Sequence, residues 1–158
     1  MPDFDPIDLA LIDLLQQDAR TPQATLAKRV GLAPSSVNER IRKLAESAIV
    51  TGYRAHVAPE ALGYDLLAFV YAGWSDPATE PAFLAAVEKE PAIVEAHHVT
   101  GSWNYMLKVR VRNTRMLEGL LAKVIKAVAG VERTETIIVL SSAKETSVVP
   151  TRDPDWYK

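Results

Sequence analysis

The chain lacks cysteine and any long apolar run, and both absences narrow its possible classes. Because none of its 158 residues is cysteine, disulfides and cysteine-ligated metal sites are excluded. The longest apolar stretch, about Leu66 to Trp74, is much shorter than the roughly 20 residues that a membrane helix requires. The first residues, MPDFDPID, are acidic and contain no apolar signal core. The sequence therefore predicts a cytoplasmic protein with no membrane partner.

The chain also lacks a basic excess, since its formal net charge is -2. That value argues mildly against nucleic-acid binding, but the charges are unevenly distributed. The first 20 residues hold five aspartates and one arginine, whereas residues 28–56 hold six basic and two acidic side chains, a local charge of +4. A basic region on a nearly neutral chain is compatible with DNA binding.

Cap signals divide the first 50 residues into three expected helices. An acceptor followed by proline marks two helix starts, at Asp5-Pro6 and Thr21-Pro22. Gly31 is placed to end the second helix in a left-handed conformation. Apolar residues at helical spacing predict the buried faces. These are Ile7, Leu11, Leu14 and Leu15, then Leu26, Ala27 and Val30, then Val37, Ile41, Leu44 and Ala48.

The start of the third helix has two possible registers. Pro34 as the first helical residue leaves Ala33 as a cap without a side-chain acceptor. Alternatively, Ser36 caps the helix and Glu39 completes a capping box. We favour the register that begins at Pro34. In the other register Glu39 is engaged by its own helix and leaves the set of DNA-reading residues.

The face of the third helix opposite its apolar stripe is rich in hydrogen-bonding groups. In an isolated amphipathic helix such a face is simply solvated. Here, however, a preceding helix that ends in glycine and a short turn complete a helix-turn-helix pattern. The segment from Ile49 to Arg54 is interpreted as a short hairpin, or wing. Hydroxyl and basic groups suit phosphates, while Asn, Arg and Glu suit base edges. The predicted DNA-binding residues are Ser35, Ser36, Asn38, Glu39, Arg42, Lys43 and Arg54.

The second half of the chain predicts the order β-α-β-β-α-β. Strands are expected at 66–73, 93–100, 105–112 and 131–140, with helices opened by Pro81 (Phe83, Leu84 and Val87 inward) and Asn113. The fold class is therefore α+β, an N-terminal winged helix-turn-helix followed by a ferredoxin-like domain with both helices on one face of an antiparallel sheet. The open face should carry His98, Thr100, Met106, Lys108 and Arg110, or their neighbours, and bury itself against another copy. The expected divisions are 1–56, linker 57–63, 64–150 and tail 151–158, with Trp156 strapped onto a neighbour.

Three stretches together resemble the Lrp/AsnC family of transcriptional regulators over about residues 5 to 150. They are the opening DxxDxxLL from Asp5, the run LAKRVGLAPSSVNERIRKLAESAIVTGYRA, and VTGSWNYMLKVRV. The resemblance implies that the third helix reads the major groove of double-stranded DNA. It also implies homodimers formed through the sheet, often assembled into octamers, with an amino-acid effector bound between dimers.

The resemblance further implies an effector site at the turn after the second strand. The family's G-x-x-D-Y motif, whose acid faces the effector's amino group, corresponds here to Gly101, Ser102, Trp103, Asn104 and Tyr105. Thr134 and Thr136 resemble its T-x-T on the last strand, and His98 could line the same pocket or an interface. Because Asn104 carries no charge, we expect the effector to be absent, weakly bound, or without a free ammonium. Alternatively, Gly101 and Asn104 merely build a hairpin turn and Tyr105 belongs to the core.

Two other functions remain open from the sequence. Some Lrp-like proteins are decarboxylases of haem precursors, and Arg54 and His56 lie near the linker, but no dense His/Arg group follows. The second alternative is a ligand-binding or assembly module without DNA function. No motif indicates a catalytic residue, a cofactor or an enzyme. His97 and His98 alternate across their strand, a geometry that disfavours a shared metal site.

Overall fold

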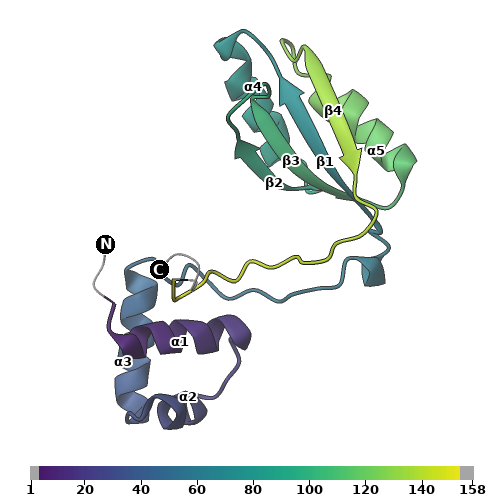
Figure 1. The fold of residues 1–158 in the computed structure, drawn as a ribbon. Coiled ribbons are helices and arrows are strands. Elements are labelled where there is room, and N and C mark those ends of the chain that lie inside the picture. Colours follow the sequence, from purple (N-terminus) through teal and green to yellow (C-terminus); the bar gives the residue numbers. More distant parts are fainter. Residues whose placement is uncertain (1–3, 154–158) are drawn as a thin grey trace. The chain divides into compact units, whose positions relative to one another are not determined.

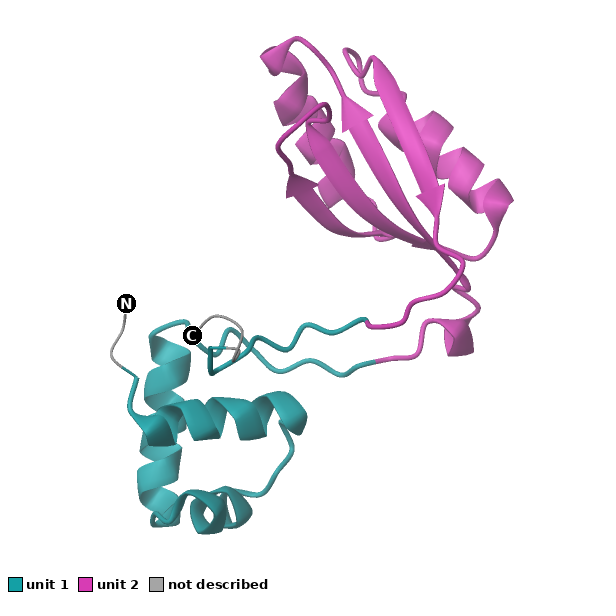
Figure 2. Cartoon of the chain, viewed as in Figure 1, with its two compact units in different colours: residues 1–56, 145–158 teal, residues 57–144 magenta. Residues whose placement is uncertain are grey.

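The computed structural model describes residues 4–153, and its internal contacts divide the chain into two compact units (Figures 1 and 2). One unit comprises residues 1–56 and 145–158, and the other comprises residues 57–144. Residues 145–150, which the sequence assigns to the C-terminal domain, thus cluster with the helical unit. No helix within residues 4–153 is long and apolar enough to cross a membrane.

The helical unit contains three helices packed around one small core. They are α1 (Pro6–Gln17), α2 (Gln23–Val30) and α3 (Pro34–Glu46). Asp5 caps α1 by accepting a 2.7 Å hydrogen bond from the N–H of Ile7, as its position before a proline predicts. The buried core residues are Leu11, Leu15, Leu26, Ala27 and Val37, with Ile7, Leu14, Val30 and Ile41 packed against them. The predicted apolar faces of α1 and α2 are confirmed.

The helix ends correct one predicted cap and decide between the two registers of the third helix. The α2 helix begins one residue late, with Pro22 rather than Thr21 at the cap position and no side-chain cap. The α3 helix begins at Pro34 as favoured, Ala33 is its cap, and no side chain caps it. The capping box from Ser36 to Glu39 is therefore wrong, so Glu39 is not engaged at the start of its own helix. Gly31 has φ 70° and ends α2 in the left-handed conformation that its position predicts.

The predicted wing is wrong, because residues 49–54 contain no strand. The α3 helix ends at Glu46, and Ala48 reverses the chain at a positive φ of 56° instead of extending the apolar stripe. The N–H groups of Ile49 and Val50 then both donate to the carbonyl of Leu44, at 2.9 and 3.0 Å. A hairpin of two or three residues per strand with no third strand beside it is not stable in water, so the segment leaves the unit as irregular chain.

The second unit is a four-stranded antiparallel sheet with the expected β-α-β-β-α-β order. The strands β1 (Leu66–Gly73), β2 (Ile93–His98), β3 (Tyr105–Val111) and β4 (Arg133–Ile138) lie in the order β2-β3-β1-β4. The helices α4 (Glu80–Glu88) and α5 (Thr114–Leu120), the latter continued by a π-helical turn (Leu121–Ile125), cover one face of the sheet (Figure 1). The predicted ferredoxin-like arrangement is confirmed.

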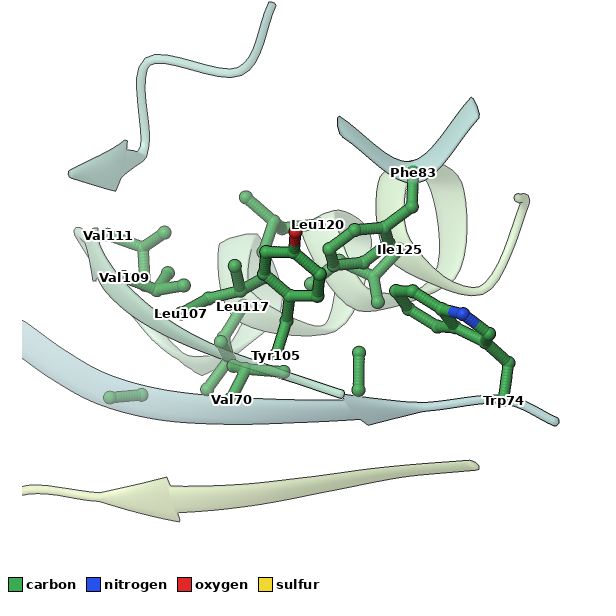
Figure 3. Close-up of a cluster of buried hydrophobic side chains, with 12 residues drawn as sticks. Val70, Trp74, Phe83, Tyr105, Leu107, Val109, Val111, Leu117, Leu120 and Ile125 are labelled. Atoms are coloured by element: carbon green, nitrogen blue, oxygen red, sulfur yellow. The ribbon is translucent and has the colours of Figure 1, made fainter. Parts of the chain in front are cut away.

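The core of this unit lies between the sheet and the two helices (Figure 3). Ala68, Val70 and Ala72 of β1 face it together with alternate residues of β3, and Phe83 of α4 is fully buried there. Leu84, predicted to point inward, is 40 % exposed, because α4 is short and only its Phe83 side faces the sheet. The open face carries residues at the alternating positions. Tyr71 lies opposite Met106, Phe69 opposite Lys108, and Leu67 opposite Arg110.

The tail after β4 is irregular, as predicted, and residues 145–153 return to the helical unit. The side chain of Gln16 on α1 forms two hydrogen bonds with the backbone of Val149, at 2.8 and 3.0 Å. Thr151 donates from its hydroxyl to Asp13 at 2.7 Å. The strap predicted at Trp156 lies outside the described residues.

Candidate DNA-reading helix and effector turn

The α3 helix exposes the polar residues that the sequence singles out. Val37 and Leu44 are buried at 0 % and 5 % exposure, which fixes the rotation of the helix on its unit. The opposite surface is solvent-exposed along two turns. Exposed on it are Ser35, Ser36, Asn38, Glu39, Arg42 and Lys43.

Arg40 stabilises the packing of α3 on α1 and is not part of the exposed polar surface. Its guanidinium donates to Asp8 at 2.8 Å and to Asp5 at 2.9 Å, so it joins α3 to the start of α1. The hydrogen bond from Ile7 and the ion pair with Arg40 lower the pKa of Asp5. The two aspartates of the opening DxxD stretch therefore hold an arginine, and the local charge of +4 overstates what the helix offers to DNA.

Arg42 is also held by carboxylates, but by those of its own helix. Its Nε and Nη2 atoms donate to the two carboxylate oxygens of Glu39 at 2.9 and 2.7 Å, and Nη1 donates to Glu46. The ammonium of Lys43 lies 3.8 Å from Glu39. The hydrogen bond from Arg42 lowers the pKa of Glu39, which keeps this carboxylate ionised.

Two further residues, Gln23 and Arg54, extend the polar surface beyond α3. The side-chain amide of Gln23, the first residue of α2, donates to Asn38 at 3.0 Å. Sequence reasoning missed Gln23, although its place at the exposed start of the first helix of the helix-turn-helix could have indicated it. Arg54 lies exposed in the irregular segment after α3. Within residues 4–153, Lys28, Arg29 and Arg54 have no carboxylate partner.

The candidate effector turn, residues 101–104, joins β2 to β3 and is held against the end of β1. Asn104 accepts a 2.9 Å hydrogen bond from the N–H of Trp74 through Oδ1, and its own N–H donates to the carbonyl of Ala72 at 3.0 Å. Gly101 has a φ of 103°, a backbone conformation that residues other than glycine rarely adopt. The Asn104 side chain thus ties the turn to the neighbouring strand.

Aromatic rings pack on both sides of this turn. On the open side, Arg133 donates to the carbonyl of Ser102 and lies 5.1 Å from the ring of Trp103. On the helix side, Tyr105 is buried and its hydroxyl donates to Glu80 at 2.6 Å, which raises the pKa of Tyr105. Figure 3 shows the Tyr105 ring beside Phe83 and near Trp74. The alternative that Tyr105 belongs to the core is therefore confirmed.

His98 does not lie on the open face, which corrects the predicted register. It pairs with Tyr105, whose side chain enters the core, so both rings lie on the helix side and stack 5.0 Å apart. His97 occupies the open side instead and contacts Glu95 at 3.2 Å. A bulge between Ile93 and Glu95 shifts the alternation, and this shift cannot be read from composition.

Thr134 and Thr136 lie on the same side as His98. They pair with Ala72 and Val70, whose side chains face the helices. Because Ala72 also accepts from the N–H of Asn104, the turn and the start of β4 flank the same end of β1. Within residues 4–153 no group of three or more His, Asp or Glu side chains could hold a metal ion.

Comparison with known proteins assigns both halves of the chain. Residues 4–45 match the AsnC-type helix-turn-helix domain, and residues 69–149 match the Lrp/AsnC ligand binding domain. The chain belongs to the Lrp/AsnC family of transcriptional regulators. It is 40 % identical over 152 residues to the HTH-type transcriptional regulator FL11 of Pyrococcus horikoshii, covering 93 % of this chain and 96 % of the relative. It is 32 % identical over 147 residues to the regulatory protein AsnC of Escherichia coli, covering 93 % and 97 %.

Solved structures of Lrp/AsnC regulators have the same fold. Escherichia coli AsnC superposes with a TM-score of 0.87 at 31 % identity, over 93 % of this chain and 99 % of that one. A transcriptional regulator from Neisseria meningitidis in complex with L-Met gives 0.89 at 26 % identity, over 93 % and 96 %. This Lrp/AsnC chain is therefore a DNA-binding transcriptional regulator with a ligand-binding domain. The named relatives regulate transcription and are not enzymes, so the tetrapyrrole decarboxylase alternative is set aside.

Proposed function

We propose that α3 enters the major groove of double-stranded DNA and that its exposed face reads the operator. Asn38, Glu39 and Arg42 suit base edges, whereas the serines and Lys43 suit phosphates. Arg54, in the irregular segment after α3, supplies a further phosphate contact. The proposed set is Ser35, Ser36, Asn38, Glu39, Arg42, Lys43 and Arg54.

One observation carries this proposal. The buried pair Val37 and Leu44 and the exposed polar residues occupy opposite sides of α3, so the polar face is free to meet a partner while the helix stays anchored. Residues 49–54 form no hairpin, but the polar face of α3 is unchanged and Arg54 stays exposed. The helix-turn-helix assignment therefore depends on α2 and α3 alone.

Selection of genomic fragments by the purified full chain tests both DNA binding and effector dependence. The protein is mixed with fragmented genomic DNA with and without a pool of amino acids, and the bound fragments are sequenced. We expect enrichment of a shared motif. Recovery of fragments without any shared sequence would contradict sequence-specific reading by α3.

We also propose that the 101–105 turn, with His98, Thr134 and Thr136 nearby, forms the effector site, and that ordinary α-amino acids bind it weakly or not at all. An ammonium group needs an acceptor, and a carboxylate pairs with it about twice as strongly as a neutral acceptor does. Asn104 offers no charge, and its Oδ1 already accepts from Trp74. The preferred effector is a small molecule without a free ammonium.

Isothermal titration calorimetry with each of the twenty amino acids tests this second proposal. We expect no measurable heat, or only millimolar binding, for the common α-amino acids. N-acylated or deaminated analogues are the next ligands to titrate. Micromolar affinity for any common amino acid would overturn the proposal and leave the DNA-binding function intact.

We propose, finally, that two copies pair through the open face of the sheet. Phe69, Tyr71 and Ile137 give this face an apolar centre, and Ile137 is 48 % exposed. Such a half-covered sheet buries its open face against a second copy. The resemblance to the family favours further assembly of dimers into octamers. Light scattering coupled to gel filtration distinguishes a dimer from an octamer, and a monomer would contradict the proposal.

A further inference from the structure

All three nitrogens of the Arg42 guanidinium donate to carboxylates on the exposed face of α3. Glu39 binds it through both oxygens, at 2.9 and 2.7 Å, and Glu46 binds the remaining Nη1 atom. The three side chains are 53 %, 48 % and 59 % exposed for Arg42, Glu39 and Glu46. We call Glu39 and Glu46 together the carboxylate clamp.

The clamp differs from the other arginine site on the same helix. Arg40 joins α3 to α1 through Asp5 and Asp8, so its ion pairs hold two helices together. The clamp joins only residues of one helix, three and four positions apart, and touches no other element through these bonds. Exposed ion pairs of this kind contribute little to stability. The fold therefore does not explain why two carboxylates surround Arg42.

DNA without the operator sequence cannot replace the hydrogen bonds that Arg42 and the two carboxylates of the clamp make with each other. Non-specific binding depends on phosphates, whose oxygens only accept hydrogen bonds. If Arg42 turned to a phosphate, it would leave Glu39 and Glu46 ionised beside the same anionic backbone. Like charges at this distance repel, so the clamp opposes sequence-independent binding.

We infer that the carboxylate clamp sets the sequence discrimination of α3 by withholding Arg42 from any site that cannot also satisfy Glu39. This inference rests on the proposed role of α3 as the reading helix. The site that satisfies both is a major-groove edge with a guanine next to a base that carries an amino group. Guanine O6 and N7 accept two of the N–H donors of Arg42, and the cytosine N4 or adenine N6 amino group donates to Glu39.

Binding of the full chain to two duplexes tests the clamp. One duplex carries the operator motif obtained by genomic selection, and the other has the same length and a random sequence. Fluorescence anisotropy at several salt concentrations gives both affinities for wild type, Glu39→Gln and Glu46→Gln. Glu118→Gln, an exposed carboxylate on α5, is the control for the loss of one negative charge.

We expect both clamp variants to bind the random duplex several-fold more tightly and with a steeper salt dependence, because Arg42 gains a phosphate contact. Glu46→Gln should tighten binding to both duplexes, because the operator offers Glu46 no partner either, whereas Glu39→Gln should lose operator affinity. The ratio of operator to random affinity should fall in Glu39→Gln and stay constant in Glu46→Gln and Glu118→Gln.

An operator-to-random ratio that is unchanged in Glu39→Gln overturns the clamp, and so does an equal fall of the ratio in Glu118→Gln. A different result would contradict the proposed role of α3 in reading DNA. If Arg42→Ala and Lys43→Ala both bind the operator as wild type does, α3 is not the reading helix. If those two variants weaken binding while Glu39→Gln keeps the ratio, only the clamp is wrong.

Discussion

Asn104 accepts a hydrogen bond from the backbone N–H of Trp74 through Oδ1, with a distance of 2.9 Å. Because a backbone N–H can only donate, this contact orients the amide. The Nδ2 group, which can only donate, then points away from Trp74, and Oδ1 keeps one lone pair at most for another partner. A side chain oriented in this way can meet a carbonyl or a carboxylate but is poorly suited to an ammonium.

The first prediction follows from this orientation. Asn104→Asp has two acceptor oxygens, so one can keep the bond to Trp74 while the other faces the candidate effector site. We expect the variant to bind α-amino acids more tightly than wild type in calorimetry, because a carboxylate pairs with an ammonium more strongly than an amide does. Equal heats for both proteins would show that residue 104 does not contact the effector's amino group.

The second prediction compares two glycines of the ligand-binding unit. Gly130 has φ 96°, and a Cβ built there would overlap Oγ1 of the buried Thr79. Gly119 lies within α5, where an added Cβ meets nothing within 4 Å. Gly130→Ala should lower the free energy of unfolding by more than about 1 kcal/mol, whereas Gly119→Ala should raise it by about 0.5–1 kcal/mol.

Urea unfolding followed by circular dichroism measures both changes. The two variants make the same chemical change in the same unit, so each serves as the control for the other. Similar midpoints for the two variants would contradict the close packing of Gly130 on Thr79.

The third prediction concerns acid stability of the helical unit. The N–H of Ile7 and the ion pair with Arg40 lower the pKa of Asp5 in the folded state. A carboxyl group with a lowered folded pKa stabilises the fold above its unfolded pKa of about 3.9, and this contribution is lost as the pH falls through the folded value. Wild type should therefore lose stability from about pH 5 downward.

Asp5→Asn isolates this effect, because asparagine is as good a helix cap but forms no ion pair with Arg40. The variant should melt below wild type at pH 7, and the difference in melting temperature should shrink as the pH falls from about 5 through the folded pKa of Asp5. Thermal melts followed by circular dichroism over this range measure the difference. A constant difference at every pH would mean that the charge of Asp5 contributes nothing.

The fourth prediction separates base reading from phosphate contact on α3. Arg42→Ala should weaken operator binding by about 5- to 150-fold, the range expected for one bidentate base contact, and relax the preference at one base position. Lys43→Ala should weaken binding to all sequences alike and flatten the salt dependence by about one phosphate contact. Competition between single-base operator variants, measured at two salt concentrations, distinguishes the two results.

The fold was largely predictable because local signals agreed with tertiary packing. Strand β1 begins and ends at the predicted residues. A short apolar run bounded by polar residues can be buried in only one way, so its limits are visible in the sequence. The start of α3 at Pro34 was also predictable, because proline is tolerated at the first helical position. In both cases the decisive information lies within a few neighbouring residues.

Features that depend on distant contacts were predicted poorly. The wing failed because two short β-prone stretches have no third strand to support them. The face of His98 was wrong because a bulge near Glu95 shifts the alternation of β2. The partners of Asp5 and Asp8 lie more than 30 residues away in sequence, at Arg40, and no local pattern reports that distance. Charge counts likewise cannot say which cations are already paired.

The return of the tail to α1 makes the helical unit discontinuous in sequence. Its two segments, residues 1–56 and 145–158, are separated by the whole of the other unit, and side chains such as Gln16 and Asp13 hold the second segment. A gene fragment that stops at residue 56 therefore encodes an incomplete unit. A protease cut between residues 56 and 57 leaves two fragments that the tail can still hold together. Breaking the chain at this point therefore need not abolish DNA binding.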